Sequence, residues 1–147
     1  MGLFPEVAIT TAHAEAIARG LFAVAKSDGL HEEEKVLIAS FWADVGGTLS
    51  ALDELSQRST ISSAELASAL EQPAIRELFL KTAILLAWAD GKVSGAERTV
   101  LGDFAEALDM SGRVAEFELQ VKEYLLSHLT HLSNTTAVAV VASRMSL

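Results

Sequence analysis

The sequence predicts an all-α fold, a single compact bundle of about seven to eight helices, and three observations lead to it. The chain has 147 residues, half of them hydrophobic, and only two prolines, so a sizeable helical core can form. Apolar residues recur at spacings of three and four along most of its length. A helix that ends in Asp-Gly and leads into a second helix occurs twice, at 22–35 and 85–98. The chain is therefore predicted to be one domain, 1–147, with internal repeats at roughly 11–58 and 73–128 and two hairpins related by a pseudo-twofold.

The second corner, 85–98, has the clearest local signals. An apolar run ends at Asp90, and Gly91 can adopt the left-handed conformation that terminates a helix. Ser94 and Glu97 then form the S-x-x-E pattern of a capping box. Glu97 precedes the next apolar residues by three and four positions, so it lies in line with the buried stripe. Both acidic side chains, Asp90 and Glu97, are therefore predicted to face the contact between the two helices.

The first corner repeats this arrangement with Asp28 and Glu34. Asp90 follows Asp28 by 62 residues (90 − 28), and Glu97 follows Glu34 by 63 (97 − 34), so the first linker is one residue shorter. His31 stands at the capping position in place of a serine, and histidine is a poorer N-cap. Glu34 is expected at the helix contact, whereas Glu32 and Glu33 are expected to face solvent.

The remaining helices follow from periodicity and from capping residues, with Thr48, either Ser62 or Ser63, and Asn134 as N-caps and Pro73 in a first turn. The predicted helices are 11–27, 31–45, 49–58, about 63–71, 73 to the turn at 90–91, 94–109, about 111–128 and 135–144. The last of these contains the β-branched run 137–142, which favours a strand by propensity. A helix is preferred because no second clear strand exists to pair with it. The predicted core includes Phe41, Phe79, Leu86, Leu101, Phe104 and Phe117.

The second corner resembles a known family through the pattern A-D-G-K-V-S-x-x-E-R. The matching residues are Ala89, Asp90, Gly91, Lys92, Val93, Ser94, Glu97 and Arg98, and upstream Asp28, Gly29 and Glu34. This pattern is similar to that of the TerB-like family of tellurite-resistance and stress-response domains, which is related to the N-terminal domain of membrane-anchored J-domain co-chaperones. The upstream copy departs from the family with Ser27, where alanine is usual, and with its shorter linker. The resemblance implies an all-helical fold whose acidic residues bind a divalent metal, and it implies no known reaction.

Asp28, Glu34, Asp90 and Glu97 are the candidate metal ligands. If the two corners meet, four carboxylates gather, and an oxygen-rich site of this kind suits calcium or magnesium. The spacing is not that of an EF-hand, because no D-x-D-x-D-G loop follows Asp28 or Asp90. The alternative is purely structural, with the aspartates ending helices and the glutamates closing capping interactions.

Composition excludes several other classes of function. The net charge of −9 opposes nonspecific binding to nucleic acid or to anionic lipid. The absence of cysteine excludes disulfides and thiolate metal sites, and no phosphate-binding loop, H-E-x-x-H or G-x-S-x-G motif is present. His128 and His131 form an H-x-x-H pair, a weak metal signal that needs a further ligand. Trp42 and Trp88 lie close to the corners and are more typical of a core than of a binding platform.

Two functions remain ahead of a hydrolase that would use the carboxylates. The first is a non-enzymatic stress-response module with a divalent-metal site, and the alternative is an adaptor whose acidic face docks a protein partner without metal. No secretory signal or membrane-spanning segment is apparent, so a cytoplasmic location is expected. Any membrane association would then run through a partner.

Overall fold

A computed structural model describes residues 8–27, 29, 32–45, 47–58, 60–88 and 95–130, and all the regular structure in these ranges is helical. The predicted all-α class is confirmed. The elements are α1 (Thr11–Lys26), α2 (Glu32–Asp44), α3 (Leu49–Gln57), α4 (Ser63–Ala69), α5 (Pro73–Ala87), α6 (Gly95–Ala107), a 3-10 turn η1 (Ser111–Arg113) and α7 (Val114–Thr130). Within this part of the chain, no helix has the length and apolar character needed to span a membrane.

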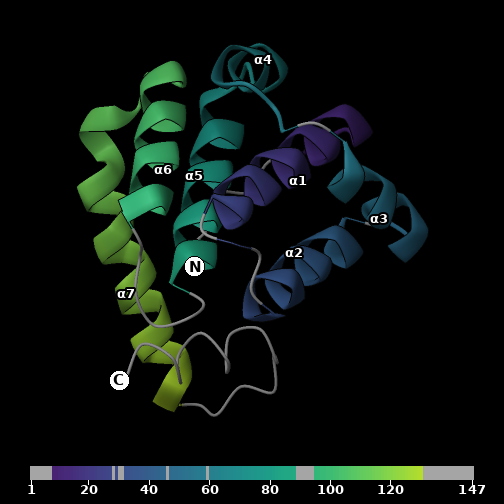
Figure 1. Cartoon of the computed structure of the whole chain (residues 1–147). Helices are drawn as coiled ribbons and strands as arrows, with labels where there is room; N and C mark the ends of the chain where they lie inside the picture. Colours follow the sequence, from purple (N-terminus) through teal and green to yellow (C-terminus); the bar gives the residue numbers. More distant parts are fainter. Residues whose placement is uncertain are drawn as a thin grey trace.

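Helices α1 and α5 lie side by side and form the centre of the bundle (Figure 1). Helices α2 and α3 pack on α1 at one edge, and α6 and α7 pack on α5 at the other. The short helix α4 lies across one end of the bundle, against α1 and α6. Each central helix is therefore packed against the helix that follows its own Asp-Gly corner.

Side-chain caps fix where several helices begin, as the sequence predicts. Thr48 accepts a hydrogen bond from the Ala51 backbone N–H, and Ser62 accepts one from the Glu65 N–H. Pro73 is the first residue of α5, where its missing N–H removes no helical hydrogen bond. The predicted boundaries of α1 to α4 and α6, and the start of α5, are met to within about two residues, which is the usual uncertainty of helix ends. Helix α5 ends at Ala87, about three residues before the predicted turn at 90–91.

Two expectations about the last third of the chain need comment. The predicted helix over about 111–128 begins as a 3-10 turn, η1, which leads directly into α7. Helix α6 ends before it in a Schellman motif, in which the Met110 N–H donates to Ala105 O and Asp109 adopts a left-handed φ of 60°. The predicted helix 135–144, with its cap Asn134, lies outside the described residues.

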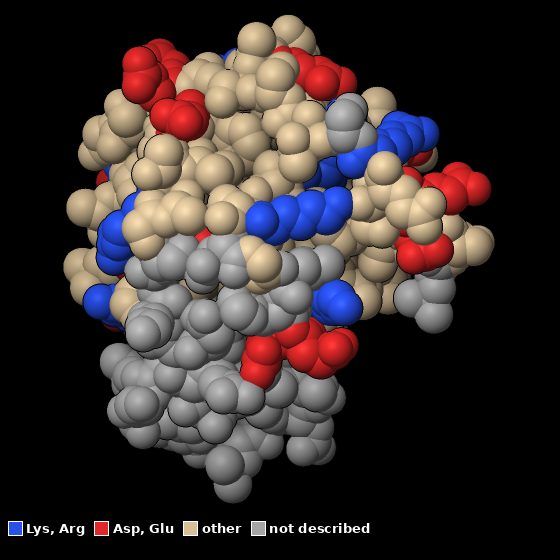
Figure 2. All heavy atoms as spheres, viewed as in Figure 1, with Lys and Arg blue, Asp and Glu red and all other residues tan. Residues whose placement is uncertain are grey.

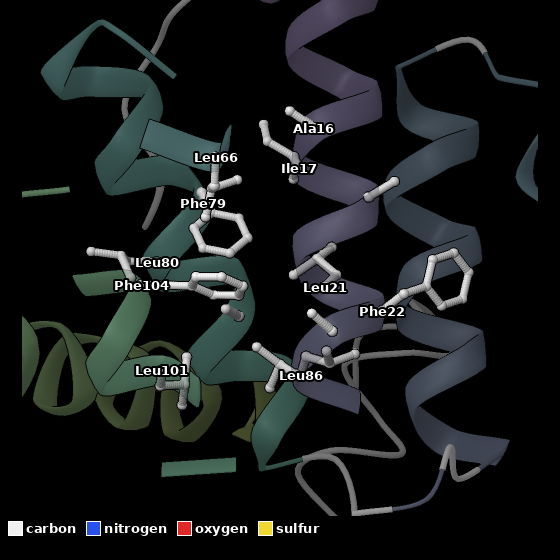
Figure 3. Packing of buried hydrophobic residues seen from close by; sticks show 14 of the residues in the cluster. Ala16, Ile17, Leu21, Phe22, Leu66, Phe79, Leu80, Leu86, Leu101 and Phe104 are labelled. Carbon is white, nitrogen blue, oxygen red and sulfur yellow. The ribbon is translucent and has the colours of Figure 1, made fainter. Parts of the chain in front are cut away.

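The core contains five of the six side chains that were predicted to be buried. The ring of Phe79 lies between Leu66 and Phe104 and faces α1 (Figure 3). Its centroid is 5.7 Å from that of Phe104, in an edge-to-face arrangement. Helix α1 approaches Phe79 so closely that a Cβ on Gly20 would lie 2.6 Å from the ring atom Cε1. Tight packing at this point leaves no room for a larger residue.

The prediction of full burial is wrong for Phe41, which is only partly buried. Phe41 lies on α2 at the edge of the bundle, whereas its counterpart Phe104 lies on α6, against which α4 packs. Phe104 is 3% exposed. The difference in burial follows from the position of α4, which the periodicity of α2 and α6 does not reveal.

Arg76 joins three helix ends through its guanidinium group. It donates hydrogen bonds to the carbonyl oxygens of Ala67 and Leu70, near the end of α4, and to that of Leu108, just beyond α6. Carbonyl groups in the last turn of a helix receive no hydrogen bond from an N–H group of the same helix. A cationic donor placed there satisfies these carbonyl oxygens and complements the helix dipole. Arg76 therefore fixes α5 against α4 and α6.

Candidate metal centre

Glu34 and Glu97 occupy the same place in two matching helices. Each is the third residue of a helix of 13 residues, α2 or α6, and the two helices begin 63 residues apart. Both side chains are buried, with exposures of 1% for Glu34 and 0% for Glu97. Each also takes part in a polar or electrostatic interaction. Their burial agrees with the prediction that these carboxylates face the helix contacts.

The other two glutamates in the first turn of α2 are less buried. Glu32 is exposed, as predicted, but Glu33 is partly buried, so the prediction that it faces solvent is wrong. The three consecutive side chains point about 100° apart around the helix. Glu34 alone therefore falls in line with the buried residues Ile38 and Trp42 of α2.

Burial repeats between the two halves of the chain at the offsets of the corners. Helices α1 and α5 contain 16 and 15 residues, and their first residues are 62 positions apart. The buried pairs include Glu34 and Glu97, Ile38 and Leu101, and Trp42 and Ala105 at an offset of 63, and Ile17 and Phe79, Leu21 and Ala83, and Val24 and Leu86 at an offset of 62. Equivalent positions therefore face the core in both halves.

The aspartates of the candidate site, Asp28 and Asp90, lie outside the described residues. Within the ranges that are described, no group of three or more His, Asp or Glu side chains is placed to hold a metal ion. The described part of the site therefore consists of the two buried carboxylates of Glu34 and Glu97. Carboxylate oxygens are the donors that hard cations prefer, so the chemistry of these two groups fits calcium or magnesium.

The chain matches no family model, no curated protein and no solved structure. The resemblance to the TerB-like family therefore stays a prediction that rests on the residues of the two corners.

The two tryptophans near the corners differ in their surroundings. Trp42 is a core residue, 5% exposed, and its indole N–H donates to the Thr48 carbonyl oxygen over 2.8 Å. Trp88, which directly follows α5, is partly buried, and the ammonium nitrogen of Lys122 lies 5.0 Å from its ring centroid. Because Trp88 precedes Asp90 by two residues, its fluorescence can report events at the second corner.

Sequence reasoning missed the interactions of two other polar groups. Lys81 interrupts the apolar run of α5 yet is 5% exposed, with its ammonium nitrogen 2.8 Å from a Glu77 oxygen and 5.3 Å from the Phe117 ring centroid. The glutamate four residues earlier is the signal that could have identified this ion pair. His13 is 7% exposed and hydrogen-bonded at both ring nitrogens. His131 lies outside the described residues, as does the side chain of His128.

Proposed function

We propose that the chain is a TerB-like, non-enzymatic stress-response module of the tellurite-resistance type, whose two corners together bind a divalent cation. The proposed ligands are Asp28, Glu34, Asp90 and Glu97, with calcium or magnesium as the favoured ion. The observation that carries the proposal is the burial of Glu34 and Glu97 at the same position of two helices of equal length. The proposed location is cytoplasmic, with any attachment to a membrane made through a protein partner.

The internal repeat supports this proposal. Helix pairs α1–α2 and α5–α6 have matching lengths, and they share the buried positions described above. Each central helix also contacts the second helix of the other pair, since α1 packs on α6 and α5 packs on α2. This exchange of contacts is what a pseudo-twofold between two hairpins produces.

A cation between the corners would add to whatever interactions already offset the burial of these carboxylates. Removing a carboxylate from water costs several kcal/mol unless the charge is neutralised or paired. Four carboxylates gathered without a cation would repel one another, so at least one would bind a proton more tightly than in a free peptide. A bound cation would relieve this repulsion and stabilise the fold by mass action.

Calorimetric and thermal titrations with calcium, magnesium, manganese and zinc test the proposal. At a concentration one hundred times the dissociation constant, a single site adds about 2.7 kcal/mol to the free energy of unfolding. For a chain of this size, that corresponds to a rise in Tm of roughly 5–10 °C. The double variant Asp90→Asn, Glu97→Gln is expected to lose the rise, because it removes two charges with little change in shape.

Glu32→Gln is the matched control. It removes a carboxylate from the same turn of α2 as Glu34, but from an exposed position, so the metal-induced rise in Tm should persist. A change in Trp88 fluorescence on adding the metal would place binding near the second corner. The proposal fails if none of the four metals shifts the Tm of the unaltered protein.

The alternative function is a protein adaptor that binds no metal. Leu119 on α7 is 59% exposed, and two acidic residues, Glu116 and Glu123, are exposed on the same helix. Figure 2 shows Asp and Glu side chains at several places on this face, including the end of the molecule where α4 lies, with Lys and Arg side chains between them. An acidic surface with an exposed leucine suits a basic partner with an apolar anchor. Leu119→Ser would then weaken capture of that partner without changing a metal titration.

A further inference from the structure

The first turn of α1 is closed by a capping box in which histidine replaces the usual glutamate or glutamine. The His13 backbone N–H donates to Thr10 Oγ1 over 3.1 Å, and the Thr10 N–H donates to His13 Nδ1 over 3.2 Å. The preceding residue, Ile9, packs against the core, as the residue before an N-cap does in a hydrophobic staple. This closure therefore also holds the chain that enters α1.

The hydrogen bonds define which nitrogen of His13 carries the proton. Nδ1 accepts from a backbone N–H, so in the neutral ring Nε2 bears the hydrogen and donates to Glu71 Oε1, 3.1 Å away. Protonation would add a hydrogen to Nδ1, so that both ring nitrogens carry one. Two donors, the Thr10 N–H and Nδ1–H, would then face each other, and the contact between them becomes repulsive.

On the other side of the ring, Nε2 of His13 faces the carboxylate of Glu71. Glu71, in the connection between α4 and α5, has a pKa below its ordinary value, first because its own backbone N–H donates to it and next because of its bond to His13. The positive charge of Arg76, on α5, lowers the pKa of Glu71 further. Further along α1, Arg19 is paired with Glu65 of α4 at 2.8 Å, so these two charges largely offset each other.

We propose that His13 is a pH-sensitive cap on the first turn of α1. When the imidazole is neutral, it holds Thr10 and keeps Ile9 against the core. When it gains a proton, it stays with Glu71 through a charged bond and releases the Thr10 N–H, which opens the entry to α1. Protonation of the imidazole ring is therefore the change that opens this cap.

The His13 cap lies far along α1 from the first corner of the proposed cation site. His13 lies near the start of α1, and the first corner follows its other end at Lys26. Thirteen residues of helix separate the two positions, a distance of about 20 Å. Loss of the Thr10 hydrogen bond therefore takes place at the opposite end of α1 from the first corner.

Hydrogen exchange of the Thr10 amide, measured by NMR between pH 5 and 8, tests the proposal. The His13 ring signals are assigned by comparison with the His13→Gln variant. As the His13 ring titrates, the protection factor of the Thr10 amide should fall roughly fivefold, the factor expected for loss of one N-cap. A protection factor that stays constant while the ring titrates would overturn the proposal.

Two variants distinguish the effect of His13 from an effect of low pH on other groups of the protein. Glutamine at position 13 offers an acceptor oxygen that does not titrate in this range, so His13→Gln should keep Thr10 protected down to pH 5. Glu71→Gln removes the anion that favours the imidazolium, so the loss of protection should remain but move to lower pH. The proposal is equally overturned if His13→Gln loses protection over the same pH range as the unaltered protein.

Discussion

Replacing Phe104 by alanine tests the account of the core most directly. The side chain is 3% exposed, and its ring meets that of Phe79 edge to face at 5.7 Å between centroids. Truncating a fully enclosed phenylalanine costs about 3–5 kcal/mol, to which the lost ring pair contributes roughly 0.5–1.5. This loss is a large share of the 5–15 kcal/mol that is typical for a domain.

The repeat offers a matched control in Phe41, which lies 63 residues upstream at the equivalent position of α2 but is only partly buried. Phe41→Ala should therefore cost at least about 1 kcal/mol less than Phe104→Ala, because less apolar surface returns to water. Urea denaturation measures both costs, with an unchanged slope as the check that unfolding stays two-state. A Phe104→Ala cost near zero, or a larger cost for Phe41→Ala, would refute the packing described here.

Three further changes probe local features. Arg76→Met leaves three carbonyl oxygens without their donor and should lower the free energy of unfolding by about 2–4 kcal/mol in the same urea assay. Asp109→Gly should raise the Tm through a gain of about 1 kcal/mol, because glycine adopts a φ of 60° without steric cost; a lower Tm would contradict this. Arg19 donates a hydrogen bond to Glu65 and holds the Glu65 pKa below its ordinary 4.5, so the resulting stabilisation is present above pH 4.5 and is lost as the pH falls further. Glu65→Gln should therefore flatten the acid limb of a stability profile, and an unaltered limb would exclude a contribution from this pair.

Helix positions could be predicted from the sequence because their signals are local. Apolar spacing places α1, α5 and α6 on the chain, and Thr48, Ser62 and Pro73 mark helix starts that the structure confirms. The position of Glu34 and Glu97 on the buried stripe also follows from spacing alone, since a glutamate three and four residues before apolar residues shares their face.

Features that depend on contacts between distant helices could not be predicted. Phe41 and Phe104 have the same local pattern, yet only α6 lies against α4. Nor does any local signal show that Arg76 reaches the ends of two other helices, or that His13 meets Glu71, 58 residues away. Periodicity states which face of a helix is buried, but not which element buries it or how completely.

The burial of Glu34 and Glu97 bears on the choice between helix caps and a cation site. In a capping box the third-position glutamate returns to the backbone at the helix start, a role that does not require the side chain to leave solvent. Both of these carboxylates are nevertheless buried, and each takes part in a polar or electrostatic interaction there. Their burial recurs at equivalent positions of two hairpins, so it belongs to the hairpin unit and not to an accident of packing in one of them. The proposed cation between the two corners would give both burials one cause.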